Sequence, residues 1–122
     1  MENCIFCKII KGEIPSYKVY EDDFVYAFLD INPSSPGHTL VIPKKHSENI
    51  FDIGKDDLER VIMVSKKISQ NMKDLGCDGI NIYNNNGKDS GQIVFHFHMH
   101  IVPRNMKSAS FEDIMNRLKI EE

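Results

Sequence analysis

The sequence predicts an α+β domain in which a five-stranded, mainly antiparallel sheet carries one long helix and short helices near the two termini. Two observations predict this class. Five apolar segments of strand length are joined largely by hairpin-like connections, and one long segment repeats its apolar residues at helical spacing. The chain has 122 residues, the usual length of one domain, so we expect a single domain over residues 1–122.

The first half of the chain is expected to hold a short helix and three strands. Apolar residues near the start give way to Gly12 and Pro15, which stop a helix. An acidic turn at residues 21–23 divides two apolar runs, which indicates a hairpin. In chain order we predict a helix at residues 5–10, a hairpin within residues 18–30, a loop rich in proline and serine at 32–37, and a strand at 38–43.

The clearest helix opens the second half of the chain. Asp56 and Asp57 suit its first turn, and Gly76 follows its end. Its apolar face is drawn by residues at helical spacing, namely Leu58, Val61, Ile62, Ser65, Ile68, Met72 and Leu75. Beyond it we predict a strand at residues 79–84, a polar turn at 87–91, a strand at 94–102 ended by proline, and a last helix at 111–118.

Composition argues against several classes of function. Fifteen Lys and Arg against eighteen Asp and Glu give a net charge of -3, whereas a dedicated nucleic-acid binder would show a basic excess. No apolar run approaches the ~20 residues of a membrane span, and the first residues do not resemble a signal peptide. Three cysteines, two of them in a Cys4-x-x-Cys7 pair, are typical of metal ligands or thiols rather than of disulfides. We expect a cytoplasmic protein that binds neither nucleic acid nor membrane.

All five histidines fall in two places. His38 and His46 flank the third strand, whereas His96, His98 and His100 share the fifth. Strand side chains alternate between faces, so these three point one way and the intervening apolar residues point the other, into the core: Phe95, Phe97, Met99 and Ile101. The histidine face should then be open. Three imidazoles on one strip predict chemistry, because imidazole titrates near neutrality, binds metals and attacks electrophiles.

Two chemistries compete for this strip. The strand could ligate a metal, although the outer histidines lie ~13 Å apart along the backbone, too far for one ion to take all three. Alternatively, the middle histidine is a nucleophile and its neighbours bind an anionic substrate. The second reading is favoured by a run of amides and flexible backbone suited to phosphate oxygens, although taken alone that run would be an ordinary polar turn: Asn85, Asn86, Gly87, Ser90, Gly91 and Gln92.

These residues resemble the histidine triad family of nucleotide hydrolases and transferases. The stretch His96-Phe97-His98-Met99-His100-Ile101-Val102 matches its signature, and residues 29–31, 37–46 and 85–92 are similar to its other blocks, in the same order. The likeness covers about residues 4–104 and is greatest to the bacterial branch related to histidine triad nucleotide-binding proteins. It implies a homodimer with a five-stranded antiparallel sheet in each subunit.

The resemblance also implies the reaction. The central histidine of the family, here His98, attacks the α-phosphorus of a purine nucleotide derivative and forms a covalent nucleotidyl-histidine that water hydrolyses. His100 would bind an α-phosphate oxygen and His38 would orient the triad. The enzyme would be of the phosphoramidase or dinucleoside polyphosphate hydrolase type.

The remaining nucleotide contacts are carried over from the same family. Asp30 would take the ribose hydroxyls, because a carboxylate accepts two hydroxyl donors. Ile31 and Phe6 would line the purine pocket, although core packing explains an apolar residue equally well. Asn85 and Gln92 would contact phosphate or the leaving group.

The Cys4-x-x-Cys7 pair has several readings from sequence alone: half of a zinc site, a redox pair, free thiols or packing. Zinc-containing relatives, including galactose-1-phosphate uridylyltransferase, combine such a pair with two histidines. Carried over, the resemblance implies a structural Zn²⁺ held by Cys4, Cys7, His46 and His96, which leaves His98 free to react.

One residue departs from the family pattern. Many relatives have serine directly after the residue that matches Gln92, and this chain has Ile93. An apolar side chain cannot donate a proton or hydrogen bond, so turnover of poor leaving groups is in question, unless Ile93 simply faces the core. This substitution favours an alternative function, a nucleotide-binding regulatory or scaffold protein with little turnover. A metallohydrolase that uses His96 and His98 as ligands is a third reading, which lacks an obvious carboxylate base.

Overall fold

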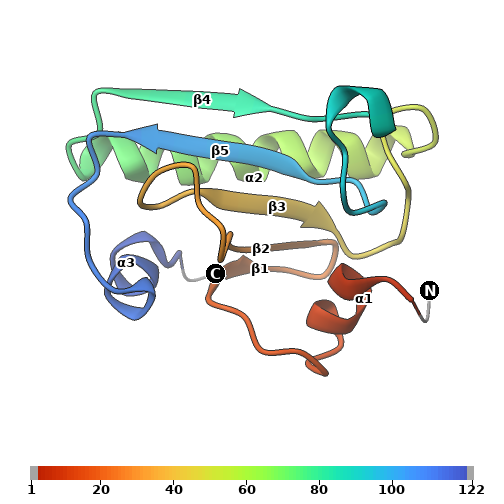
Figure 1. Cartoon of the computed structure of the whole chain (residues 1–122), viewed down its shortest axis with the longest axis horizontal. Coiled ribbons are helices and arrows are strands. Elements are labelled where there is room, and N and C mark those ends of the chain that lie inside the picture. The colour runs from red at the N-terminus through yellow and green to blue at the C-terminus, as the bar shows by residue number, and fades with distance from the viewer. Residues whose placement is uncertain (1–2, 121–122) are drawn as a thin grey trace.

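The computed structural model describes residues 3–120 and has a five-stranded sheet at its centre (Figure 1). Every pair of neighbouring strands is antiparallel, in the order β1-β2-β3-β5-β4. The strands are β1 (Lys18–Glu21), β2 (Val25–Leu29), β3 (Thr39–Pro43), β4 (Gly79–Tyr83) and β5 (Met99–Arg104). The helices are α1 (Ile5–Ile10), α2 (Lys55–Asp74) and α3 (Phe111–Leu118), with a 3-10 turn at Lys88–Ser90. The predicted fold class is confirmed.

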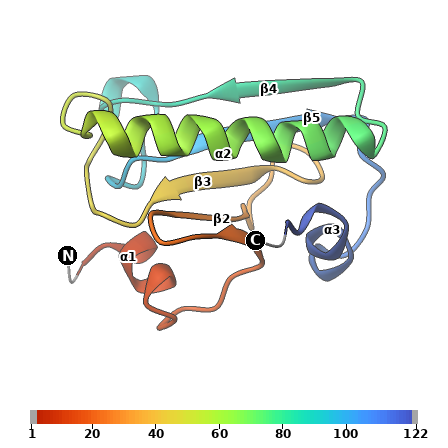
Figure 2. The ribbon, with the colours of Figure 1, turned by 180° about the vertical axis from the view of Figure 1, so that it is seen from behind.

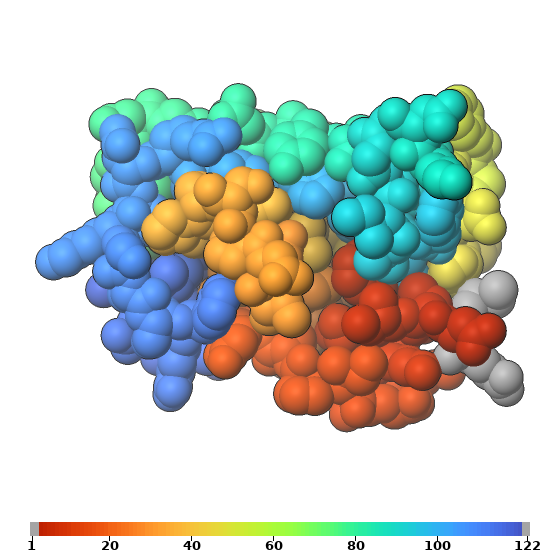
Figure 3. Space-filling model, in the orientation of Figure 1, coloured from red at the N-terminus to blue at the C-terminus, as the bar shows by residue number. Residues whose placement is uncertain are grey.

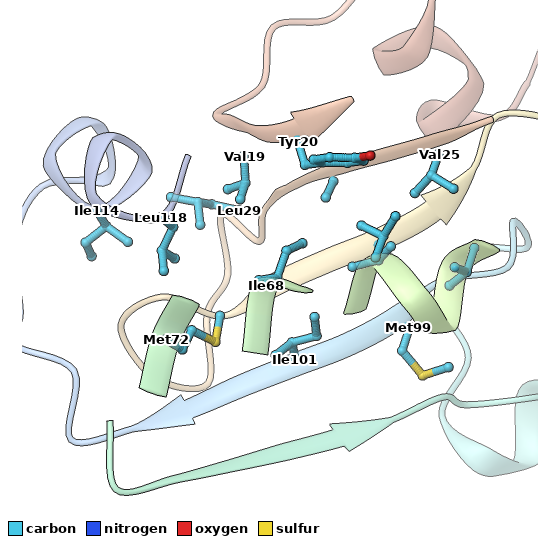
Figure 4. Close-up of a cluster of buried hydrophobic side chains, with 14 of the residues drawn as sticks. Val19, Tyr20, Val25, Leu29, Ile68, Met72, Met99, Ile101, Ile114 and Leu118 are labelled. Atoms are coloured by element: carbon cyan, nitrogen blue, oxygen red, sulfur yellow. The ribbon is translucent and has the colours of Figure 1, made fainter. Parts of the chain in front are cut away.

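Helix α2 covers one face of the sheet, as Figure 2 shows. Its buried residues Val61, Val64, Ile68 and Met72 pack against β2, β3 and β5, and Figure 4 shows this cluster with the side chains of α3 at one end. The amphipathic pattern therefore places the helix correctly. Two residues assigned to its apolar face are nevertheless exposed, Ile62 and Leu75, because each lies at the margin of the stripe that the sheet covers.

Helix α1 packs on the opposite face of the sheet. Phe6, Cys7 and Ile9 are buried against Tyr26, Phe28, Leu40 and Ile42. The strands β2 and β3 are consequently buried on both faces, since every residue in each of them is buried. No helix in the described range 3–120 is long and apolar enough to span a bilayer.

The fifth strand begins later than predicted, and this changes the setting of the histidines. We predicted a strand from residue 94, but β5 begins at Met99, and the Phe97 amide donates to the Ser47 carbonyl instead of to a neighbouring strand. The prediction of an open histidine face is also wrong. His96 is 0% exposed and His98 6% exposed, with Phe6 of α1 packed edge to face on both rings, whereas Phe95, predicted to be core, is 43% exposed.

Candidate functional site

The histidines of the triad have three different surroundings. His96 lies with Cys4, which caps α1, and with Cys7 inside that helix, whereas His98 packs against Phe6 and His100 lies beside His38. Figure 3 shows the face of the molecule that α1 (red) occupies, hollowed between the loop at residues 31–37 (orange) and the segment at residues 85–95 (cyan). Which nitrogen of each ring carries a proton follows from its neighbours, and this decides what each ring can do.

His96 belongs to a compact cluster with Cys4, Cys7 and His46. One ligand atom from each residue lies within 4.8 Å of all the others. The Nδ1 atom of His96 is 3.3 Å from the Cys4 sulfur and 3.5 Å from the Cys7 sulfur, and the Nδ1 atom of His46 is 3.4 Å from the Cys7 sulfur. Two sulfurs and two imidazole nitrogens form the donor set of a structural zinc site.

The second ring nitrogen of His96 supports the same reading. Its Nε2 lies 2.8 Å from the Pro43 carbonyl oxygen, which can only accept, so Nε2 carries the proton and Nδ1 presents a lone pair to the sulfurs. Burial lowers the pKa of His96 to about 4, which keeps the ring neutral. Burial and the adjacent Cys4 raise the pKa of the Cys7 thiol, and a divalent cation would reverse that shift. The predicted residues therefore fit a zinc ion.

His98 is held in the tautomer that a nucleophile needs. Its Nδ1 is 2.7 Å from the backbone carbonyl oxygen of His96, so Nδ1 carries the proton and Nε2 keeps its lone pair. The Phe6 ring meets the imidazole edge to face at 5.1 Å. Burial lowers the pKa of His98, against the opposing effects of the His96 carbonyl and of Asp30, so the ring is neutral near pH 7.

His38 and His100 form a directed chain of hydrogen bonds. The Ser34 amide donates to Nδ1 of His38 at 3.0 Å, so the His38 proton sits on Nε2, which is 2.9 Å from Nδ1 of His100. His100 must then carry its own proton on Nε2. That atom is buried and has no hydrogen-bond partner within residues 3–120. An unsatisfied buried donor beside a nucleophile is suited to an anionic ligand atom.

The same chain of bonds argues against a second metal. Asp30, His38 and His100 also bring ligand atoms within 4.8 Å of one another, and the Asp30 carboxylate lies 3.7 Å from Nε2 of His38. A metal at this place would need a lone pair on Nε2 of His38. The Ser34 amide, which donates to the other nitrogen, keeps the proton on Nε2.

The residues predicted to bind the ribose and the purine lie near these hydrogen-bonded histidines. Asp30 follows β2 and accepts the Asn32 amide through one carboxylate oxygen at 2.9 Å. Ile31 is 67% exposed next to it, so its side chain is open to a ligand rather than packed in the core. Phe6 is buried in the α1 cluster and contacts His98.

The side chain of Gln92 holds the loop between β4 and the triad by hydrogen bonds to other parts of the protein. The Gln92 carboxamide is buried, donates to the carbonyls of Glu48 (2.6 Å) and Val94 (3.0 Å), and accepts the Gly87 amide at 2.8 Å. Both hydrogens of the carboxamide bond to carbonyls of the protein, and the phosphate contact of Gln92 stays a prediction. Asn85 lies against Gly91 at the other side of the loop.

Ile93 does not face the core. It is 87% exposed and lines a cavity of about 580 Å³ together with Ile5, His46, Glu48 and Phe95. Sequence reasoning missed two other neighbours of the triad, Tyr83 and Asn84 at the end of β4, because their contacts depend on the register between β4 and β5.

Comparison with known proteins agrees with this geometry. A family model described as the HIT domain matches residues 11–107. The protein called hit in Bacillus subtilis is 51% identical over 112 residues, which are 90% of this chain and 77% of that protein. The adenosine 5'-monophosphoramidase of Saccharomyces cerevisiae is 46% identical over 101 residues, covering 83% of this chain and 62% of the yeast protein.

A solved structure gives the same result in three dimensions. The Zn-bound histidine triad family protein of Mycobacterium smegmatis superimposes with a TM-score of 0.90 at 35% identity, over 97% of this chain and 91% of that one. The likeness therefore extends over the sheet, the helices and the histidine segment. This chain belongs to the histidine triad (HIT) family.

Proposed function

We propose that this protein is a nucleotidyl hydrolase that acts on the α-phosphate of purine nucleotide derivatives through a covalent intermediate on His98. The observation that carries the proposal is the tautomer of His98, whose Nδ1 proton is held by the His96 carbonyl at 2.7 Å while Nε2 is free. The yeast relative, named an adenosine 5'-monophosphoramidase, favours a phosphoramidate over a dinucleoside polyphosphate as the substrate.

The reaction proceeds in two steps at phosphorus. The Nε2 atom of His98 forms a bond to the α-phosphorus as the bond to the leaving amine breaks, and the amine takes up a proton from water as it departs. A water molecule then forms a new bond to phosphorus as the bond to Nε2 breaks, and it gives a proton back to the solvent. This step releases the nucleotide and restores neutral imidazole. Since the pKa of His98 is lowered, the ring begins each cycle unprotonated near pH 7.

The surrounding residues bind the substrate and stabilise developing charge. The unpartnered Nε2–H of His100 donates to a non-bridging phosphate oxygen, and His38 holds that ring by donating to its Nδ1. Asp30 accepts the ribose hydroxyls, Ile31 and Phe6 flank the purine, and Asn85 lies on the phosphate side. A Zn²⁺ ion on Cys4, Cys7, His46 and His96 would supply a structural tie between α1 and the segment that carries the triad.

Two further proposals come from the family resemblance. We propose a homodimer, in which β4, an edge strand with Ile82 and Tyr83 exposed, faces a second copy. We also propose that the protein acts in the cytoplasm.

A binding protein with little turnover is the second candidate function, favoured by Ile93. The exposed isoleucine provides no donor for a leaving group. Under this alternative, nucleotide would bind but the covalent intermediate would form slowly or not at all.

One experiment separates the two candidates. The protein is mixed with adenosine 5'-phosphoramidate, quenched in acid-free buffer and examined by mass spectrometry for an adenylyl adduct, beside a His98→Ala variant. We expect an adduct on His98 and release of AMP in the wild type, and a loss of turnover of several orders of magnitude with nucleotide binding retained in the variant. Turnover of the variant within tenfold of wild type would remove His98 from this role.

A further inference from the structure

Tyr83 and Asn84, at the end of the edge strand β4, contact two histidines of the triad. Tyr83 pairs with His100 in the register between β4 and β5. The two rings are stacked, with centroids 4.4 Å apart and planes 12° from parallel. The next residue, Asn84, donates from its carboxamide to the His98 carbonyl at 2.9 Å.

The stack adds a second restraint on the plane of the His100 ring. Among residues 3–120 the side chain of His100 has one hydrogen bond, from His38 to Nδ1, which restrains rotation about the bond between Cβ and the ring. Small rocking about that bond would still move Nε2, the nitrogen farther from the hydrogen bond. A parallel aromatic ring against the face of the imidazole limits this rocking.

The anchor for the stack is also rigid. Because Asn84 ties β4 to the carbonyl of His98, the spacing between β4 and the triad segment is set two residues before His100. Tyr83 is 39% exposed in the single chain and lies outside the buried core, with its ring stacked on His100. The contact of Tyr83 within this chain is therefore with the histidine, whether or not a second copy covers the edge of β4.

We propose that Tyr83 is a positioning residue that holds the His100 ring in the plane where its Nε2 hydrogen meets the phosphate oxygen. This inference rests on the proposed function, in which His100 binds the α-phosphate. It does not require that Tyr83 touch the substrate. The groups that face His100 and would share any change in its titration are His38, His98 and Asp30.

The test compares four proteins: the wild type, Tyr83→Leu, Tyr83→Phe and the control Tyr17→Leu. Tyr17 is an exposed tyrosine of similar exposure, stacked on Phe111 at 5.2 Å, away from the triad, so its loss measures the general effect of removing a surface stack. Tyr83→Phe keeps the stack. Sedimentation and thermal melting check the mass and the fold of each, and Tyr83→Met replaces the leucine variant if the latter does not fold or does not keep the mass of the wild type.

Two readouts are taken, one of them independent of activity. For adenosine 5'-phosphoramidate we expect Tyr83→Leu to lower kcat by about tenfold to hundredfold with KM changed by less than about threefold, since only a contact that tightens in the transition state is lost. In ¹⁵N NMR of the histidine rings we expect the His100 signals to move toward a mixture of tautomers and its pKa to rise. Tyr83→Phe should match the wild type in both.

The outcomes are separable. If Tyr83→Leu and Tyr17→Leu behave alike in kcat and in the NMR of His100, the positioning role of Tyr83 is refuted. If the wild type shows no turnover, the proposed function fails, and the ring NMR alone then decides whether Tyr83 holds His100.

Discussion

Replacing Gln92 by leucine should destabilise the protein rather than abolish a phosphate contact. The buried carboxamide makes three hydrogen bonds, two to the carbonyls of Glu48 and Val94 and one from the Gly87 amide. Glu48, Gly87 and Val94 are not fully buried, so water can replace the lost hydrogen bonds at their backbone groups. Each lost bond should therefore lower the free energy of unfolding by about 1 kcal/mol, and not by the larger cost of a buried group left without a partner. Three bonds predict a loss of about 3 kcal/mol in the free energy of unfolding.

Urea unfolding of the metal-loaded protein measures this change, with Gln70→Leu as the control. Gln70 is exposed on α2, so the same chemical replacement there should change the free energy of unfolding by less than about 0.5 kcal/mol. Binding of AMP to the folded Gln92→Leu protein should weaken as the loop loosens. An unfolding free energy equal to that of the control, combined with a large loss of AMP affinity, would show that Gln92 contacts the phosphate directly and that our reading of its bonds is wrong.

Four other predictions follow from the same structure. Cys4→Ser should lower the zinc content from about one ion per chain and should lower the melting temperature, because the short helix α1 would lose its metal ligand. Metal analysis measures the zinc content and calorimetry measures the melting temperature. An unchanged melting temperature in protein free of zinc would contradict the site. Ile93→Ser should raise kcat for poor leaving groups by about five- to hundredfold without loss of stability, because Ile93 is 87% exposed; equal effects on good and poor leaving groups would oppose this. Burial, together with the nearby His98 and His38, lowers the pKa of His100 to about 4 from an ordinary 6.5. The neutral ring therefore stabilises the folded state fully above pH 6.5, and this contribution, on the order of 1–3 kcal/mol, is lost as the pH falls toward 4, because the unfolded chain takes up the proton first. If a His100→Gln variant shows the same pH dependence in urea unfolding, the loss does not come from His100. Sedimentation at micromolar concentration should give twice the mass of the chain, and the mass of a single chain would exclude the dimer.

The sequence predicted those parts of the fold that local patterns decide. The hairpin of β1 and β2 follows from two apolar runs around an acidic turn, and the helix at Phe111–Leu118 was predicted with the bounds that it has. The start of β5 could not be predicted in this way. Residues 94–98 alternate like a strand, yet the amide of Phe97 bonds to the Ser47 carbonyl, a long-range contact that no local pattern contains.

In the candidate site, too, the sequence indicates the residue types but not the contacts that those residues make. The resemblance named Cys4, Cys7, His46 and His96, and the structure brings their ligand atoms within 4.8 Å of one another. It also named Gln92, whose carboxamide the structure places on the carbonyl of Glu48, a contact that the sequence does not indicate. Residue type and spacing identify a chemical group, but whether that group is free to meet a ligand depends on partners far along the chain.

The three histidines of the triad have different roles because a different group forms a hydrogen bond to one nitrogen of each ring and thereby decides which nitrogen carries the proton. A carbonyl from Pro43 holds the proton of His96 on Nε2 and turns Nδ1 to the sulfurs, whereas the His96 carbonyl holds the proton of His98 on Nδ1 and leaves Nε2 to react. For His100 the partner is another imidazole, which accepts an amide from Ser34 and so must donate onward. Each ring has the same chemistry in isolation, and backbone groups from three different segments select a metal ligand, a nucleophile and a donor from it. The backbone partner thus selects which nitrogen of a ring is free, and the neighbours of that nitrogen, sulfurs beside His96 and none beside His98, decide what it can bind.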